Sequence, residues 1–338
     1  MDSLTHIFSG ALVGELVLGR KVGRKAMFWG AVAANLPDLD SIAYLFVNDV
    51  EALWIHRGLS HSIFTAILLG PLIGWILSLV YKSSHVHASL WMFMITLNLI
   101  IHNFLDTCTA YGTGLLEPFV STRYSIHSIF ILDPVFTLPL LISFIALLIL
   151  RNDSSMRRKW ISGGLALSTL YLMLTFFNRA TVSEITRYSI HEKEIKYEEF
   201  IVTPTILNSI LWNIIVKDTG GFYIGYYSLL DRDRDIELHY FPRKDYLLES
   251  VGSQDEVSIL KRFAQGYYII SRENTNTWFN DLRFGQVRGW EKPDAPFAFA
   301  FNLTAGGDNS DVVQRGRIEG SKRAALKSLW RRMMHNEY

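Results

Sequence analysis

Cysteine is nearly absent from this sequence of 338 residues, and Cys108 is the only one. A disulfide within the chain is therefore excluded, and so is a zinc site that needs several thiolates. Charged residues are scarce as well, at 19% of the chain against about 25% in a typical soluble domain. The formal net charge is only +1. Such a balance does not predict binding of nucleic acid.

A cleavable signal peptide is not expected either. The first apolar stretch, Ile7–Gly19, contains Glu15 and lacks the basic segment that precedes the apolar part of such peptides. Hydrophobic residues nevertheless make up 49% of the chain. This composition predicts a protein that is partly embedded in a membrane and partly exposed to water.

Apolar segments in the first half of the chain predict the membrane crossings. Ile63–Tyr81 and Trp160–Phe177 carry no charge and approach the roughly 20 residues that a helix needs to span a bilayer. Four further segments are shorter or contain an ionisable residue: Ile7–Gly19, Ala26–Phe46, Leu90–Leu105 and Ile129–Leu150. The expected fold is an α-helical multi-pass membrane bundle of about six segments, over residues 1–180.

Basic residues predict how this bundle is oriented. They concentrate in three connections, Arg20–Lys25, Lys82–Ser89 and Arg151–Lys159. Alternating crossings put these connections on one side, which the positive-inside rule assigns to the cytoplasm. Arg57 and Arg123 are the only basic residues in the short loops of the opposite side. We therefore expect a protein of the cell (inner) membrane whose C-terminal domain lies on the non-cytoplasmic side.

Residues 181–338 have the composition of a water-soluble domain. Short runs rich in β-forming residues alternate with turn signals, and two amphipathic stretches predict helices. The expected strands are Leu211–Lys217, Phe222–Leu230, Ile236–Phe241, Tyr267–Ser271 and Phe297–Leu303, and the expected helices are Val257–Gln265 and Lys322–Met334. This pattern predicts a small α+β extramembrane domain with an antiparallel sheet.

Five polar motifs lie at the ends of the apolar segments or interrupt them. They are Met1–His6, Asn35–Asp40, His56–Ser62, His102–Gly112 and Ile131–Pro134. Hydrocarbon disfavours ionisable side chains, so such residues need a partner or a function. Imidazoles and carboxylates together are the usual ligands of zinc and related metals. The motifs predict a metal centre at the outer membrane surface, with one or two divalent ions of the zinc type.

Spacing supports several of these residues as ligands. His102 and Asp106 are four residues apart and so lie on one face of a helix. His56 and His61 can converge from a loop, and Asp38 and Asp40 can point the same way. An alternative stays open for each pair. His102 and Asp106 can form a surface hydrogen bond, His61 can cap a helix while His56 lies at the membrane interface, and Asp38 and Asp40 can belong to a turn that ends a helix.

The remaining candidates are assigned by position. His6 lies on the same side as the other motifs, and it is either a ligand or an exposed histidine. Asp133 either caps a helix or accepts a hydrogen bond from a ligand imidazole, and we favour the second role. In a hydrolase, Asp38 would position the metal, and Arg57, with Arg123 as a further candidate, would hold an anionic group of the substrate.

The five motifs also resemble those of a known family. MDxLTH, NxPDLD, HRGxSHS, HxxLDxxTxYG and an FxxDP-like element mark the YdjM-like, LexA-regulated membrane-bound metal-dependent hydrolases, and here they occur in that order within residues 1–180. The resemblance implies a bacterial inner-membrane hydrolase. It also implies seven metal ligands: His6, Asp38, Asp40, His56, His61, His102 and Asp106.

Two functions follow as hypotheses. The first is a metal-dependent hydrolase that cleaves a lipid or a lipid-linked (phospho)ester at the bilayer surface. The alternative is a non-enzymatic membrane protein with a structural or sensed metal and an outer domain that binds a partner. A transporter is disfavoured, because its ligands would lie near the middle of the bilayer rather than on one side.

Overall fold

The computed structural model describes residues 1–251, 254–273, 276–303 and 322–334. The chain divides into two compact units. The first consists of Met1–Leu45, Ile55–Ile126 and Ile131–Leu174. The second consists of Phe46–Trp54, His127–Phe130 and Thr175–Tyr338. Helix α7 (Met156–Glu192) contributes its first half to one unit and its second half to the other.

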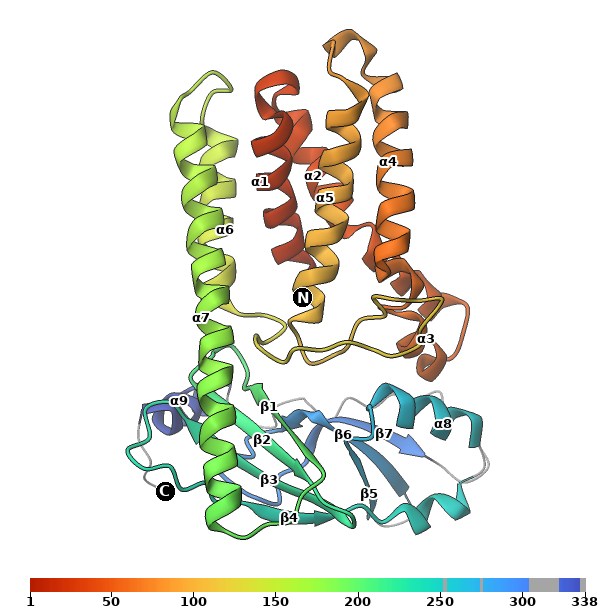
Figure 1. Cartoon of the computed structure of the whole chain (residues 1–338), viewed down its shortest axis with the longest axis vertical. Coiled ribbons are helices and arrows are strands. Elements are labelled where there is room, and N and C mark those ends of the chain that lie inside the picture. Colours follow the sequence, from red (N-terminus) through yellow and green to blue (C-terminus); the bar gives the residue numbers. More distant parts are fainter. Residues whose placement is uncertain (252–253, 274–275, 304–321, 335–338) are drawn as a thin grey trace. The chain divides into compact units, whose positions relative to one another are not determined.

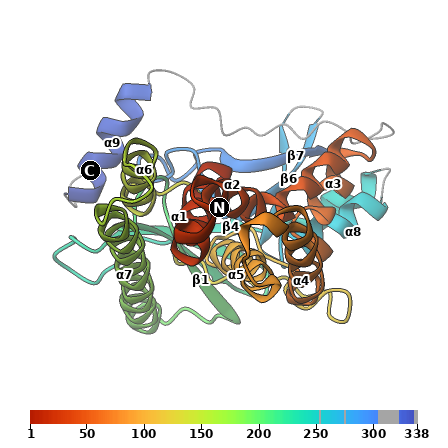
Figure 2. The same cartoon turned by 90° about the horizontal axis from the view of Figure 1, so that it is seen from above.

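The first unit is helical. Its long helices are α1 (Ser3–Val22), α2 (Arg24–Asn35), α4 (Ile63–Val80), α5 (Ala88–Thr107), α6 (Pro134–Ile149) and the first half of α7. Figure 1 shows α1, α2, α4 and α5 side by side, and Figure 2 shows the same helices nearly end-on. Helix α1 packs on α2, α5 and α6, and α4 packs on α5. Trp91, Met94 and Ile95 of α5 lie in the core of this bundle.

Helices α1 and α2 form a tight hairpin because small residues face each other. A Cβ atom on Gly10 would lie 2.5 Å from the carbonyl oxygen of Gly30, so neither position has room for a side chain. Gly23 makes the turn between the two helices with a φ of +62°, which favours glycine. The hairpin therefore brings the beginning of α1, with His6, to the same end as the end of α2.

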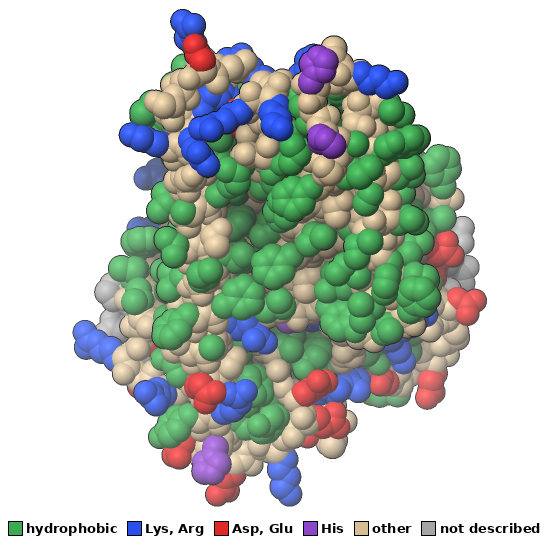
Figure 3. All heavy atoms as spheres, turned by 45° about the horizontal axis from the view of Figure 1, so that its top comes forward, with side chains coloured by type: hydrophobic (Ala, Val, Ile, Leu, Met, Phe, Trp, Pro, Cys, Tyr) green, Lys and Arg blue, Asp and Glu red, His purple; other side chains and the backbone are tan. Residues whose placement is uncertain are grey.

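Three helices among the described residues are long and apolar enough to cross a membrane: α4, α5 and α7. Helix α6 is apolar but shorter. Figure 3 shows hydrophobic side chains over a broad face of the helices, whereas Lys and Arg gather at one end. The stretch Ala26–Phe46, predicted as one segment, instead contains α2 and the 3₁₀ helix η1 (Pro37–Leu45). These three helices support three of the six expected crossings, and the other three stay a prediction.

The end of the bundle opposite the Arg20–Lys25 connection is built from short elements. In the chain, η1 is followed by α3 (Asp49–Ile55), most of which belongs to the second unit, and then by the 3₁₀ helix η2 (Leu59–His61) of the first unit. Ser62 then caps α4, because its side chain accepts a hydrogen bond from the backbone N–H of Phe64. Residues 108–133 between α5 and α6 are mostly irregular. Turns of this kind bring polar side chains toward the ends of the helices.

The second unit contains two antiparallel sheets. Strands β1 (Glu199–Pro204), β2 (Leu211–Lys217), β3 (Gly221–Ser228) and β4 (His239–Pro242) follow one another in the first sheet. Strands β5 (Tyr268–Glu273), β6 (Asn276–Gln286) and β7 (Phe297–Leu303) form the second sheet. This unit also contains η4 (Asp245–Ser250), α8 (Gln254–Phe263) and α9 (Lys322–Met334). The remaining short element, η3 (Lys82–Ser84), belongs to the first unit. The predicted antiparallel character of this region is confirmed, although one sheet was expected.

Strand β1, strand β6 and the second half of α7 were not among the expected elements. Strand β6 contains Asn280, Asp281 and Arg283, which do not suggest a buried strand. Their polar groups are satisfied internally: Asp281 and Arg283 form a fully buried ion pair at 2.6 Å, and Asn280 donates to the hydroxyl of Ser271. Helix α7 continues to Glu192, beyond the apolar segment that ends at Phe177, because Val182 packs into the core of the first sheet.

Candidate metal centre

The last two turns of α5 contribute two side chains to the centre. His102 and Asp106 are fully buried and lie one helical turn apart, with Nε2 of His102 3.5 Å from Oδ2 of Asp106. Nδ1 of His102 lies 2.6 Å from the backbone carbonyl oxygen of Ala34, at the end of α2. Since a carbonyl oxygen only accepts, Nδ1 carries the proton and Nε2 presents its lone pair to Asp106.

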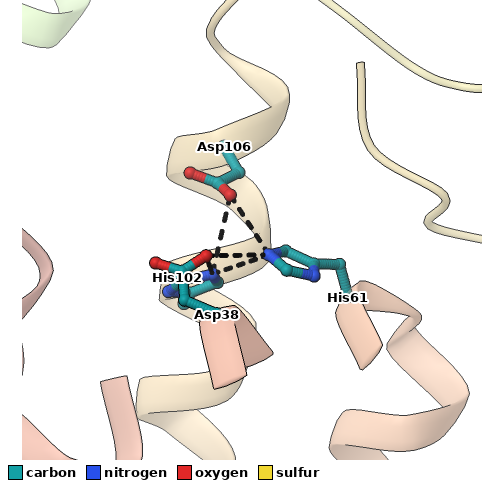
Figure 4. Close-up of side chains that lie close together, drawn as sticks. All are labelled: Asp38, His61, His102 and Asp106. Atoms are coloured by element: carbon teal, nitrogen blue, oxygen red, sulfur yellow. Dashed lines mark hydrogen bonds and ion pairs between the residues drawn. The ribbon is translucent and has the colours of Figure 1, made fainter. Parts of the chain in front are cut away.

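Two further side chains come from the short elements after α2 and α3. His61 lies in η2 and Asp38 in η1. One ligand atom from each of Asp38, His61, His102 and Asp106 lies within 4.8 Å of every other, as Figure 4 shows. Nε2 of His61 is 3.0 Å from Nε2 of His102 and 3.4 Å from Oδ1 of Asp38. These four residues are called the four-residue cluster below.

Outer contacts also hold the ring of His61. Nδ1 of His61 lies 2.9 Å from the hydroxyl of Ser60 and 3.3 Å from Oδ2 of Asp40. A carboxylate beside Nδ1 keeps the proton there and leaves Nε2 to face the cluster. Burial alone would lower the pKa of His61, but hydrogen bonds with Asp106, Asp38 and Asp40 raise that pKa to about 9. The cluster therefore favours positive charge at this position.

Asp40 and His56 lie behind His61. Oδ1 of Asp40 is 2.7 Å from Nδ1 of His56, and Oδ2 accepts hydrogen bonds from the backbone N–H of Arg57 and the hydroxyl of Ser60. Asp40 therefore ties the loop before η2 to η1. Of the seven predicted ligands, the structure brings four into the cluster and leaves these two beside it.

His6, the seventh predicted ligand, lies at the edge of the cluster. Its Nε2 is 3.1 Å from Oδ1 of Asp106, and its ring centroid is 3.9 Å from that of His102. Its Nδ1 has no hydrogen-bond partner among the described residues, although the side chain is fully buried. The amino nitrogen of Met1 contacts the same oxygen of Asp106. His6 therefore touches two members of the cluster without joining it.

Arg57 supplies positive charge on the other side of Asp106. Its side chain is 4% exposed, and Nε lies 3.1 Å from Oδ2 of Asp106. Nη1 donates to the hydroxyl of Thr109 at 2.8 Å, and the guanidinium lies over the ring of Tyr111. Arg57 thus balances the charge of Asp106. The predicted contact of Arg57 with a substrate remains a prediction.

Arg123 is the other basic residue predicted in the outer loops, and it is also buried. Its Nη2 lies 3.3 Å from Oε1 of Glu117, and its Nη1 donates to the backbone carbonyl of His56 at 3.1 Å. These contacts hold the loop that carries His56 and Arg57. The guanidinium therefore has a structural partner on each side.

Asp133 caps helix α6. Its Oδ1 accepts hydrogen bonds from the backbone N–H groups of Val135 and Phe136, and its Oδ2 accepts one from the hydroxyl of Tyr171. This is the first of the two roles considered for Asp133. Within the described part of the chain, these contacts do not include a histidine.

Sequence patterns did not reveal the groups that orient the two imidazoles. The carbonyl of Ala34 orients His102, and Ser60 with Asp40 orients His61. A backbone carbonyl leaves no trace in a sequence, so the first contact could not have been predicted. Ser60 does stand inside the HRGLSHS motif, next to His61. Its position between two candidate ligands was the available signal.

Comparison with known proteins shows which proteins this chain resembles. Residues 1–182 match the family described as YdjM inner membrane protein. The chain is 29% identical over 239 residues to the uncharacterized protein YfhP of Bacillus subtilis (strain 168), covering 67% of this chain and 68% of that protein. It is 30% identical over 124 residues to the inner membrane protein YbcI of Escherichia coli (strain K12), covering 36% of this chain and 69% of that protein.

No solved structure matches the chain. The family match covers every residue of the four-residue cluster and the helices α4 and α5, which are apolar enough to span a membrane. It extends over more than half of the 338 residues. The chain is therefore a membrane protein that belongs to the YdjM inner membrane protein family.

Proposed function

We propose that this protein is a membrane-bound metal-dependent hydrolase whose divalent ion is held by Asp38, His61, His102 and Asp106. The observation that carries the proposal is the convergence of their four ligand atoms within 4.8 Å of one another. Two imidazole nitrogens and two carboxylates are a donor set suited to zinc. One ion accounts for the cluster, and His6 lies close enough to Asp106 to extend it.

The donor set fits a cation for an electrostatic reason. Nε2 of His61 and Nε2 of His102 face each other at 3.0 Å, while the other nitrogen of each ring is held by an acceptor. Oδ2 of Asp106 is buried, 3.1 Å from Nε of Arg57 and 3.3 Å from Nε2 of His61. Arg57 offsets the charge of Asp106, but the carboxylate of Asp38 and the two facing imidazole nitrogens still favour a cation between them.

A bound divalent ion would polarise a phosphoryl or carbonyl oxygen and activate water at neutral pH. The chain's own residues would then determine access and orientation. Asp38 is the most accessible member of the cluster, with its side chain 18% exposed against 0% for the other three. Asp38 would therefore border the approach of a substrate, while Asp40 holds His61 in the tautomer that binds.

The surface beside the cluster favours a lipid or lipid-linked (phospho)ester as substrate. Leu39 and Ile42 in η1 and Leu59 in η2 are each half-exposed or more. These apolar side chains neighbour Asp38 and His61 in the sequence and in the same short helices. An acyl chain could therefore stay in hydrocarbon while its headgroup reaches the cluster. The proposed topology has about six crossings, with the cluster and the C-terminal domain on the non-cytoplasmic side.

One observation favours the alternative of a structural or sensed metal. Four protein ligands complete a tetrahedral zinc site, and structural sites are closed in this way, whereas catalytic sites keep a position open. Three of the four ligands are fully buried. In this alternative, the outer domain binds a partner protein and the metal stabilises the loops around η1 and η2.

Metal analysis followed by an activity assay separates these functions. Purified protein would be tested on a panel of lipid phosphoesters and carboxylic esters, with and without chelator. The proposal predicts hydrolysis of a member of the panel, loss with chelator and recovery with added metal. Bound metal without hydrolysis of any panel member would favour the structural role, and protein without bound metal would contradict both.

A further inference from the structure

The second unit contains a small apolar cavity that the proposed hydrolase site does not use. Its volume is about 160 Å³. Strands of both sheets and helix α9, which packs on β3, form its wall. Apolar side chains that line it are Pro204, Ile206, Phe284, Ala298 and Leu329. An engineered apolar cavity of about 150 Å³ takes up benzene, so this cavity has the size of one six-membered ring.

One wall residue is polar, buried and without a partner. Asn213 lies on β2, where its Cα faces Thr203 of β1 and Tyr226 of β3. The residue is 2% exposed, and neither Oδ1 nor Nδ2 has a hydrogen-bond partner among the described residues. By contrast, the buried amide of Asn280 donates to Ser271. Since a buried amide without a partner is disfavoured, the position indicates a group that binds there.

Gly285 leaves the amide of Asn213 accessible from the cavity. Its φ is +72°, and a Cβ atom at this position would lie 3.4 Å from Nδ2 of Asn213. A larger side chain here would therefore cover the amide nitrogen. Arg288 also lines the cavity, but its Nε donates to Glu291 at 2.8 Å. The cavity thus offers the amide of Asn213 for hydrogen bonding, whereas the charge of Arg288 is already neutralised by Glu291.

We propose that this cavity binds a small neutral molecule with an apolar body about the size of one ring and one primary amide group. The carboxamide of Asn213 would pair with that amide, since each group has one donor face and one acceptor face. A charged ligand is disfavoured because the cavity would desolvate its charge without a free counter-charge. The site and its ligand are independent of the metal centre.

Fluorine NMR on the full chain in lipid nanodiscs tests the site. The probes are 4-fluorobenzamide and 4-fluorotoluene, which share a ring and differ in the amide. We expect 4-fluorobenzamide to bind about tenfold more tightly, the factor that a net hydrogen bond of ordinary strength gives. Asn213→Leu should remove this preference and keep binding of 4-fluorotoluene. Because leucine resembles asparagine in shape and needs no hydrogen bond, we expect this variant to fold.

Two neighbouring alanines on α9 provide a matched control. Ala325 lines the cavity and is buried, whereas Ala324 is exposed and does not line it. Ala325→Leu should fill the cavity and abolish specific binding of both probes, and Ala324→Leu should leave it unchanged. The difference between these two proteins corrects for partition of the probes into lipid.

Three results would overturn the proposal. Equal affinity for the two probes would show that Asn213 does not pair with the amide. Equal binding by the Ala324→Leu and Ala325→Leu proteins would show that the probes bind elsewhere. If neither probe binds specifically to the folded wild-type chain, the cavity does not bind a molecule of this kind.

Discussion

His61 and His102 each have one ring nitrogen engaged outside the four-residue cluster and one turned into it. The outer contacts are the carbonyl of Ala34 for His102 and Asp40 with Ser60 for His61. Such contacts are usual for metal-binding histidines, because they fix the tautomer and the direction of the lone pair. The residues around the cluster therefore have two roles: some bind the ion, and others orient the residues that bind it.

Replacement of His102 should remove the metal. His102→Ala deletes a buried nitrogen donor that neighbouring side chains cannot replace, so we expect metal content to fall to a small fraction of wild type. Elemental analysis of purified protein measures this. His191→Ala is the control, because the side chain of His191 is 89% exposed and lies far along the sequence from the cluster. Equal metal content in the two variants would contradict the role of His102.

Replacement of Asp40 should weaken metal binding without abolishing it. Asp40→Asn keeps the shape of the side chain but removes the carboxylate that faces Nδ1 of His61. Loss of such an outer contact commonly costs about 10- to 100-fold in metal affinity. Asp38→Asn, which alters a proposed ligand, should have the larger effect. Competition with a metal indicator measures both, and a larger loss for Asp40→Asn would make Asp40 the ligand, as the family resemblance implies.

At the scale of elements, a buried ion pair joins three helices of the first unit. Nε of Arg157 in α7 lies 2.8 Å from Oε1 of Glu15 in α1. Nη1 of Arg157 also donates to the backbone carbonyls of Leu147 and Leu150, at the end of α6. Both charged side chains are about 5% exposed or less. Arg157 therefore provides hydrogen bonds to the last carbonyl groups of α6, and its ion pair with Glu15 links α7 to α1.

Removal of one partner should destabilise the bundle strongly. Arg157→Met leaves the charge of Glu15 buried and unpaired, which typically costs about 3–5 kcal/mol. The double variant with Glu15→Gln should recover much of this loss, because the uncompensated charge is gone. Thermal unfolding in detergent measures the effect, with Arg158→Met as the control at an exposed neighbouring position. Similar stability of the two single variants would exclude a role for the pair.

The connections between helices test the proposed orientation. Cys108 is buried, so the natural chain provides a quiet background for labelling with an impermeant thiol reagent. Thr122→Cys, in the loop after α5, should react from the non-cytoplasmic side of intact cells. Ser155→Cys, between α6 and α7, should react only after the membrane is opened. Both positions are exposed. Reversed accessibility would put the cluster on the cytoplasmic side.

At the scale of the whole molecule, sequence patterns predict some levels of structure better than others. The helix Lys322–Met334 and the strand Leu211–Lys217 were expected with the bounds that the structure shows. The strand is a short run of β-forming residues, and the helix has apolar residues at helical spacing, so each has a clear signal. Strand β6 has no such signal, since its buried Asp281 and Arg283 pair with each other. Tertiary pairing of polar residues cannot be read from a pattern of single residues.

The candidate site was likewise predictable in part. A cluster of His and Asp was predicted from motifs near helix ends, and the structure contains such a cluster. The expectation that Asp38 and Asp40 point the same way assumed an extended chain or a turn, and it is wrong. They lie in a 3₁₀ helix, where residues two apart are about 240° apart around the axis. Here Asp40 turns to His56 and Ser60, while Asp38 turns to His61.

The central claim is that one divalent ion binds between Asp38, His61, His102 and Asp106. X-ray absorption at the edge of the bound metal tests it most directly on the purified full chain. We expect about four nitrogen and oxygen ligands near 2.0–2.1 Å, the usual range for zinc, with the outer-shell scattering of two imidazoles. His61→Ala and His102→Ala should each lose one imidazole or the ion itself. A metal ligated by sulfur, or an imidazole signal unchanged in both variants, would contradict the account.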